Sequence, residues 1–98
     1  MPRTLSIDDI QSYATHVAQM FDLQKISLFG SYATGKNSRK SDVDLLVDFG
    51  SKDITLYDIA NVKLKMEELT KKPVDVIATP IPKESILQID KEVLLYAK

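Results

Sequence analysis

The order of local sequence patterns predicts an α/β domain in which helices cover a small β-sheet. Apolar residues recur at helical spacing near the start and in the middle of the chain, and short apolar runs bounded by turn residues lie between them. At 98 residues the chain can bury one core, so we expect residues 1–98 to form a single domain. The expected elements are a helix over 7–21, a strand over 25–29, a helical turn over 31–35, a strand over 42–49, a helix over about 54–70, a strand over 74–78 and a last helix after Pro82.

The first half of the chain carries clear start and stop signals. Ser6 followed three residues later by Asp9 is a near capping box, which predicts the start of the first helix. The first strand ends at Gly30, and a polar loop over 36–40 separates it from the next strand. Alternation along that next strand gives one face made of Asp42, Asp44, Leu46 and Asp48, and another made of Val43, Leu45, Val47 and Phe49. Because the second face is entirely apolar, we expect it to lie in the core.

The second half of the chain is expected to add a helix, a strand and a last helix. Lys71-Lys72-Pro73 ends the middle helix, because proline lacks a backbone donor and restricts the residue before it. Pro82 can open the last helix, since proline is tolerated in a first helical turn. The apolar stripe expected on this helix consists of Ile86, Ile89, Val93 and Tyr96. Leu87, Leu94 and Leu95 lie off the stripe, which leaves room for a second buried side, for example against another chain.

Composition and charge exclude several classes of protein. With 13 basic and 14 acidic side chains the net charge is -1, and the lysines are dispersed, so stable binding of nucleic acid is not expected. The chain has no cysteine, which excludes disulfides and thiolate metal sites and leaves oxygen ligands for hard cations such as Mg²⁺. No apolar run is long enough to span a membrane, and Asp8 and Asp9 interrupt the region where a signal peptide would be apolar. A cytoplasmic protein is therefore expected.

Two short motifs point to the chemistry. Asp42 and Asp44 are separated by one residue on an expected strand, so both side chains face the same way and can converge on cations that bridge triphosphate oxygens. Gly30 and Ser31 lie at an expected strand-to-helix turn. Gly30 lets the backbone approach a phosphate without a Cβ in the way, and Ser31 offers a hydroxyl group. Together the motifs predict a site for a nucleoside triphosphate and divalent metal.

The spacing of these motifs resembles the nucleotidyltransferase superfamily related to DNA polymerase beta. Gly30-Ser31 is followed by ten residues, 32–41, and then by Asp42-Val43-Asp44, which is the signature of that family. More narrowly, the chain is similar to the minimal nucleotidyltransferases of the MntA antitoxin type. The family has a third aspartate on a later strand, and Asp75 fits that place. The resemblance implies a mixed sheet in which the strands of Asp44 and Asp75 are adjacent, with helices on one side and the active site on the other.

The resemblance also implies roles for the three aspartates. Asp42 and Asp44 are expected to bind two Mg²⁺ ions, whose coordination the triphosphate completes. Asp75 is expected to bind the ion nearest the acceptor and to take the proton of the acceptor hydroxyl as general base. Taken by itself, Asp75 is equally compatible with a solvated position at the end of a strand.

The nucleotide is expected to bind beside these carboxylates. Gly30 and Ser31 are the predicted phosphate-binding residues. Relatives often carry arginine at the position of Thr34, and here Lys36 or Arg39 in the following loop can contact the β- or γ-phosphate in its place. A solvated loop is the alternative interpretation of both basic residues.

The predicted activity is Mg²⁺-dependent transfer of AMP from ATP to a hydroxyl group. The resemblance implies that the hydroxyl belongs to a tyrosine of a partner HEPN-domain ribonuclease toxin, which the chain would silence as an antitoxin within a hetero-oligomer. One alternative is a non-catalytic module that neutralises the toxin by contact alone. Another is nucleotidyl transfer to a small molecule or an RNA end, although relatives with those activities usually carry an additional helical domain.

Three further residues are interpreted without a catalytic role. Asp48 shares the face of the two motif aspartates but precedes a turn, so we interpret it as a solvated turn residue. His16 is the only histidine, and its place on the first helix, far from the motifs in the sequence, favours a surface position. For Tyr32, stacking on the nucleotide and ordinary packing are both open.

Overall fold

The structure is a computed structural model that describes residues 5–35, 42–50, 53–79 and 92–98. Its elements are α1 (Ile7–Phe21), β1 (Lys25–Phe29), α2 (Ser31–Thr34), β2 (Val43–Asp48), α3 (Leu56–Thr70), β3 (Val74–Ala78) and β4 (Val93–Ala97). The first helix, the first strand and the strand around Asp75 have the predicted bounds. The helical turn after Gly30 also forms, and Gly35 ends it with a φ of 79°.

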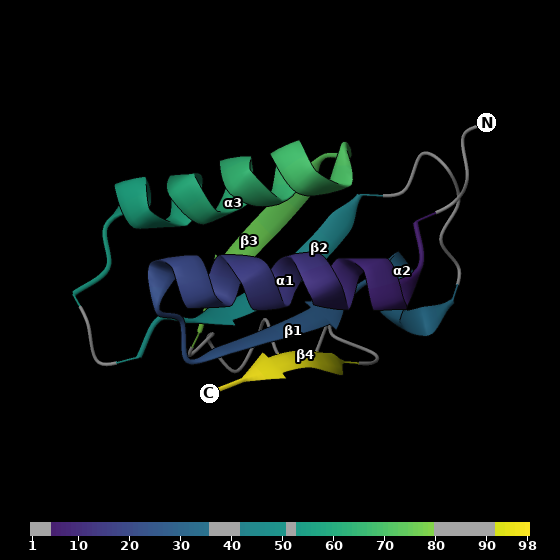
Figure 1. The fold of residues 1–98 in the computed structure, drawn as a ribbon, viewed down its shortest axis with the longest axis horizontal. Coiled ribbons are helices and arrows are strands. Elements are labelled where there is room, and N and C mark those ends of the chain that lie inside the picture. The colour runs from purple at the N-terminus through teal and green to yellow at the C-terminus, as the bar shows by residue number, and fades with distance from the viewer. Residues whose placement is uncertain (1–4, 36–41, 51–52, 80–91) are drawn as a thin grey trace.

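The strands form one mixed sheet in the order β3-β2-β1-β4. β1 pairs antiparallel with both β2 and β4, whereas β2 and β3 are parallel. Helices α1 and α3 lie side by side across one face of the sheet (Figure 1). The α/β class, the mixed sheet and the adjacency of β2 and β3 are therefore confirmed. Within the described residues, no helix is long and apolar enough to cross a lipid bilayer.

The core lies between the two long helices and the sheet. Val43, Leu45 and Val47 on β2 are completely buried, which confirms the predicted inward face of that strand. The sheet and the two helices contribute further fully or almost fully buried side chains, among them Ile10, Val17, Ile26, Leu28, Val62 and Met66. Because alternate residues of a strand point to opposite faces, Asp42 and Asp44 lie on the face of the sheet away from α1 and α3.

Both long helices begin at a complete capping box. The Ser6 hydroxyl accepts a hydrogen bond from the Asp9 amide at 3.1 Å, and the Asp9 carboxylate accepts one from the Ser6 amide at 3.2 Å. Thr55 and Asp58 make the same reciprocal pair at the start of α3. Each box satisfies backbone donors that a helix start leaves unpaired. The second box explains why α3 begins at Leu56 rather than near residue 54.

The prediction of a helix at the C-terminal end is wrong for Val93 and Tyr96. These residues belong to β4, which pairs with β1 and closes that side of the sheet (Figure 1). Leu95 is buried whereas its neighbour Leu94 is 54% exposed, as on a strand that packs one face on the core. Pairing with the open edge of β1 overrides the local helical spacing, since Val and Tyr favour strands as well. Ile86 and Ile89 lie outside the described residues.

Candidate active site

The pairing of β2 with β3 places Asp44 and Asp75 side by side. The two residues are partners in the register of the parallel pair. Neighbouring strands are about 4.8 Å apart, and partners in register project from the same face. Asp42 precedes β2 and lies two residues before Asp44, so it belongs to that face as well. The three predicted aspartates thus gather at one end of the face that the long helices leave open.

Gly30 lies directly against the carboxylate of Asp44. The strand pairing puts Phe29 opposite Asp44, and the chain then turns at Gly30, which has a φ of 76°. A Cβ atom added to Gly30 would collide with Oδ2 of Asp44 and would lie 3.1 Å from its Cγ. The turn continues into α2 through a hydrogen bond from the Ala33 amide to the Gly30 carbonyl. Glycine is therefore required here both for the positive φ and for the space that Asp44 occupies.

The carboxyl group of Asp44 has a perturbed proton affinity. Burial raises its pKa most, and the charge of Asp75, a hydrogen bond with Asp75 and the charge of Asp42 raise it further, from 3.8 to about 6. Crowded carboxylates disfavour each other's ionisation, and desolvation disfavours the charged form. The same crowding makes the group a good place for a divalent cation, whose positive charge would reverse both effects.

The donor set at this end of the sheet fits a hard cation. Its side-chain ligands are carboxylate oxygens, which Mg²⁺ prefers, and the chain has no cysteine to favour a softer metal. Within the part of the chain that the structure describes, no three acidic or histidine side chains lie close enough together to hold a metal ion as they stand. Asp42 and Asp75 are exposed, so neighbouring residues leave room for their side chains to change rotamer. Repulsion between ionised carboxylates disfavours a closer cluster of all three until a cation compensates their charge.

The backbone just before Asp75 is held from two directions. The Val43 amide donates to the carbonyl of Pro73 at 3.0 Å, which ties β3 to β2. The Val74 amide donates to Oε2 of Glu67, on α3, also at 3.0 Å. Sequence reasoning did not single out Glu67, because a glutamate on a predicted helix looks like a surface residue. No motif or spacing in the sequence signals this contact.

The remaining predicted residues have different outcomes. The backbone of Ser31 begins α2 next to Gly30, as expected for a phosphate-binding turn. Lys36 and Arg39 lie outside the described residues, so their contact with phosphate stays a prediction. Tyr32 is only 1% exposed, which supports packing rather than stacking on a nucleotide. Its buried hydroxyl has no hydrogen-bond partner in the described structure.

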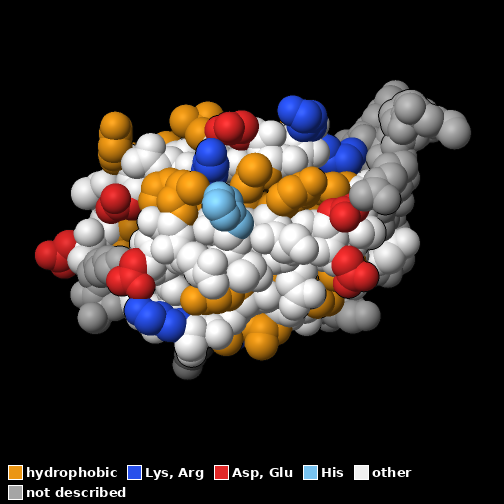
Figure 2. Space-filling model, viewed as in Figure 1, with side chains coloured by type: hydrophobic (Ala, Val, Ile, Leu, Met, Phe, Trp, Pro, Cys, Tyr) orange, Lys and Arg blue, Asp and Glu red, His pale blue; other side chains and the backbone are white. Residues whose placement is uncertain are grey.

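Asp48 and His16 lie where the sequence interpretation places them. Asp48 ends β2, and its carboxylate accepts a hydrogen bond from the Gly50 amide at 2.7 Å, as expected of a turn residue. His16 is exposed on α1. On the face shown in Figure 2, basic and acidic side chains are scattered and form no continuous basic area, and hydrophobic side chains lie beside the pale blue histidine. This face therefore has no sign of the concentrated positive charge that binding through nucleic-acid phosphates requires.

Comparison with known proteins agrees with this geometry. A family model described as nucleotidyltransferase domain matches residues 10–96. A predicted protein adenylyltransferase of Methanocaldococcus jannaschii is 32% identical over 94 residues, which cover 92% of this chain and 100% of that protein. The protein adenylyltransferase MntA of Thermococcus cleftensis is 39% identical over 49 residues, which cover 46% of this chain and 50% of that protein.

Solved structures share the fold. A crystal structure of a toxin–antitoxin with AMP-PNP contains a chain with a TM-score of 0.76 and 21% identity, covering 90% of this chain and 73% of that one. A complex of tri-AMPylated Shewanella oneidensis HEPN toxin with its MNT antitoxin gives a TM-score of 0.70 at 17% identity, covering 94% and 73%. A predicted minimal nucleotidyltransferase gives a TM-score of 0.67 at 27% identity, covering 90% and 96%. The first two likenesses, at such low identity, concern the fold alone.

Proposed function

The chain belongs to the nucleotidyltransferase domain family, and we propose that it transfers AMP from ATP to a hydroxyl group of a partner protein. The observation that carries the proposal is the register pairing of Asp44 with Asp75 beside Gly30. A similar protein that matches over its whole length is named for adenylyl transfer to proteins, which supports a protein acceptor. The family membership makes the chain a nucleotidyltransferase, and the acceptor is the part that the proposal adds.

In the proposed reaction the oxygen of the acceptor hydroxyl attacks the α-phosphorus of ATP. A new phosphorus–oxygen bond forms, the bond from the α-phosphorus to the β-phosphate oxygen breaks, and pyrophosphate leaves. Asp75 takes the proton of the hydroxyl as general base. Gly30 and Ser31 accommodate the phosphates at the turn into α2. The missing Cβ of Gly30 leaves room for the Asp44 carboxylate beside this turn.

Divalent cations are part of the proposal. Asp42, Asp44 and Asp75 would hold two Mg²⁺ ions, with Asp75 nearest the acceptor. When bound, such ions neutralise the charge that develops on the phosphoryl and pyrophosphate oxygens and lower the pKa of the attacking hydroxyl. Burial and the neighbouring carboxylates raise the pKa of Asp44 in the absence of a compensating charge, and cation binding would restore its ionised form.

The acceptor that we propose is a tyrosine of a HEPN ribonuclease toxin. One similar structure contains a tri-AMPylated HEPN toxin together with an MNT antitoxin, and another holds a toxin–antitoxin with an ATP analogue. By analogy the chain would act as an antitoxin that inactivates its partner by modification. Dependence on ATP and an RNA-cleaving partner would make the cytoplasm its place of action.

A label-transfer assay tests the proposal. The chain is incubated with ATP labelled at the α-phosphate, Mg²⁺ and its HEPN partner, and the partner is then analysed for label and for the modified residue. Asp44→Asn should lower the rate at least about 10³-fold, because it removes a carboxylate from the proposed metal site. Asp48→Asn is the matched control, since it makes the same change on the same strand at the other end and should retain activity.

The other outcomes identify the competing functions. Full activity of Asp44→Asn would contradict the catalytic assignment. Neutralisation of the toxin by an unlabelled complex with Asp44→Asn would favour inhibition by contact alone. Label found on RNA or on a small molecule, but not on the partner, would contradict the protein acceptor while leaving nucleotidyl transfer intact.

A further inference from the structure

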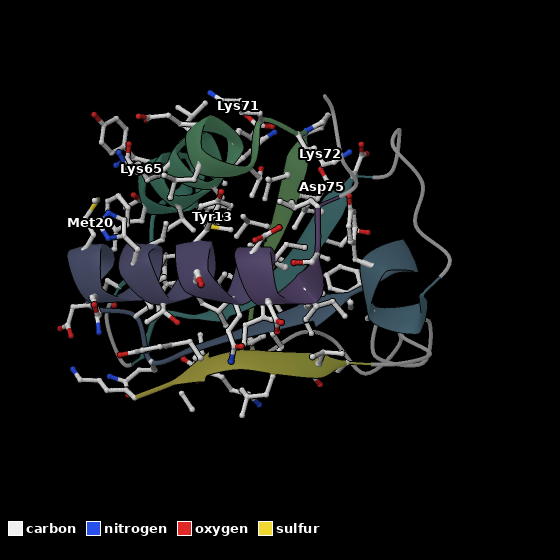
Figure 3. All side chains as sticks on the ribbon, turned by 45° about the vertical axis from the view of Figure 1, so that its right-hand side comes forward. Tyr13, Met20, Lys65, Lys71, Lys72 and Asp75 are labelled. Atoms are coloured by element: carbon white, nitrogen blue, oxygen red, sulfur yellow. The ribbon has the colours of Figure 1, made fainter. Side chains whose placement is uncertain are left out.

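We propose that Glu67 is a positioning residue for Asp75, which it serves by fixing the peptide unit between Pro73 and Val74. This inference rests on the proposed metal-binding role of Asp75. Glu67 belongs to α3 and touches neither the nucleotide nor the reacting atoms in the proposed reaction. It acts through the backbone of the turn that leads from α3 into β3, which Figure 3 shows at Lys71 and Lys72, next to Asp75.

The peptide unit between Pro73 and Val74 is bound on both of its sides. In a trans peptide the carbonyl and the amide point in opposite directions. The Pro73 carbonyl accepts from the Val43 amide at 3.0 Å, so it points toward β2. The Val74 amide therefore points away from β2, and there it donates to Oε2 of Glu67 at 3.0 Å. The carbonyl of this peptide unit fixes the register with β2, and the carboxylate of Glu67 fixes the direction of its amide.

The position of β3 in the sheet explains why a side chain is needed. Among the described residues β3 is an edge strand, so no strand of this part of the chain lies on its outer side to accept the Val74 amide. Val74 itself is completely buried, where an unpaired amide is unfavourable. Glu67 thus replaces a neighbouring strand at the first residue of β3. The next residue is Asp75, and its placement beside Asp44 follows from this anchored start.

The surrounding contacts hold the carboxylate of Glu67 in place. The hydrogen bond from the Val74 amide is the main cause that lowers its pKa, and Lys63 adds to this effect from 3.4 Å away. The Lys71 amide donates to the Glu67 carbonyl at 2.8 Å and ends the helix there. The buried hydroxyl of Thr70 accepts from the Lys72 amide at 3.3 Å. The turn from α3 to β3 therefore has hydrogen bonds of its own. The Glu67 carboxylate adds the bond that connects α3 to the first residue of β3.

Variants of Glu67 separate positioning from charge. Glu67→Ala removes the acceptor, whereas Glu67→Gln keeps an oxygen that can accept from Val74 but loses the charge. Lys63→Met leaves the carboxylate and removes its ion pair. Glu68→Ala is the matched control, because Glu68 is the adjacent glutamate of α3 and pairs with Lys65 at 3.4 Å, on the exposed surface.

The first readout is the Mg²⁺ concentration that gives half-maximal AMP transfer. Glu67→Ala should raise it about tenfold, in the range of residues that support metal ligands, while the rate at saturating Mg²⁺ changes less. Glu67→Gln, Lys63→Met and Glu68→Ala should stay within about twofold of the unmodified chain. A Mg²⁺ dependence of Glu67→Ala equal to that of Glu68→Ala would overturn the proposal. Equal defects in Glu67→Gln and Glu67→Ala would also overturn it, because the acceptor would then not be the feature that matters.

A second readout needs no activity, and its first measurement does not use Glu67→Ala. In NMR spectra of the unmodified chain, the Val74 amide shift should follow the titration of Glu67, and this response should vanish in Glu67→Gln. Mn²⁺ should broaden the Asp75 amide signal at a lower concentration in the unmodified chain than in Glu67→Ala. A Val74 amide that ignores the Glu67 titration overturns the proposal. An unmodified chain that transfers no AMP would contradict the proposed function, while these spectra still decide the role of Glu67.

Discussion

Asp44 and Asp48 lie on the same face of β2, four residues apart, yet the structure gives them different surroundings. Asp44 lies beside Asp75 and against Gly30. Asp48 ends the strand, accepts from the Gly50 amide and has Lys25 as its register partner on β1. The residue type and the strand are the same, so the difference arises from the neighbours. A carboxylate becomes a candidate for catalysis when other elements bring further carboxylates to it.

The extent of β3 explains the difference between the two ends. The parallel pairing runs from Val43 and Val74 to Val47 and Ala78, so β3 supplies a partner for Asp44 but none for Asp48. At the Asp44 end, β1 is followed by a turn at Gly30, and the missing side chain of this glycine leaves room for the Asp44 carboxylate. The sheet is thus built to concentrate negative charge at one end of β2 and to end the strand in an ordinary turn at the other.

The contrast between the Asp44 end and the Asp48 end of β2 is tested most strongly by replacing the glycine at each end with alanine, which adds a methyl group. Gly30→Ala should lower AMP transfer about 100-fold or more, because the new Cβ forces the Asp44 carboxylate from its position. Gly50→Ala meets the Cγ of Gln24 at 2.9 Å, and that flexible side chain can move aside. Its φ of 80° should cost about 1 kcal/mol of stability and little activity. Label-transfer rates and urea unfolding of both variants measure the two effects.

Stability data control the glycine comparison. If Gly30→Ala unfolds below the assay temperature, its activity must be compared with that of Gly50→Ala at a temperature where both are folded. Equal losses of activity in the two folded variants would contradict a special role for the space beside Asp44.

A smaller effect is expected in the pH dependence of stability. The pKa of Asp44 is raised to about 6 in the folded chain, so between pH 3.8 and 6 the folded chain keeps a proton that the unfolded chain has lost. Stability must therefore fall as the pH rises through this range. Asp44→Asn has no titrating group at this position. Without Mg²⁺, its free energy of unfolding relative to that of the unmodified chain should therefore increase by about 1 kcal/mol from pH 4 to 7, after allowance for solvent screening.

Denaturant unfolding at several pH values measures this difference. Asp75→Asn removes one of the causes that raise the pKa of Asp44, so it should reduce the pH effect without abolishing it. Added Mg²⁺ should stabilise the unmodified chain at pH 7 more than Asp44→Asn, because it binds the folded carboxylate cluster. A pH-independent difference between Asp44→Asn and the unmodified chain would contradict the crowded environment.

The smallest expected effect concerns the other end of β2. Asp48→Ala removes the 2.7 Å hydrogen bond to the Gly50 amide and should lower stability by about 1 kcal/mol. Because Asp48 has no place in the proposed site, AMP transfer measured below the unfolding transition should be unchanged. A large loss of activity in folded Asp48→Ala would extend the catalytic face along the whole strand and remove the contrast with Asp44.

Local signals predicted most of the elements, and they singled out the three aspartates and Gly30 as candidates for the site. The capping boxes at Ser6 and Thr55 mark helix starts through contacts within four residues, so sequence spacing is enough to find the first of them. The apolar alternation of β2 determines which of its faces is buried. The C-terminal strand was missed because its apolar residues fit either period, and only the partner strand decides between them.

The sequence by itself determined which aspartates are candidates for the site, where the glycine turn lies and which face of β2 is apolar, because each depends on residue type and short-range periodicity. The tertiary structure decided which strands are neighbours, and hence that Asp75 lies beside Asp44, that Gly30 touches the Asp44 carboxylate and that β4 completes the sheet. It also revealed Glu67 at the peptide before Asp75. These contacts join residues that are distant in the chain, and their free energy depends on packing and pairing that no local pattern encodes.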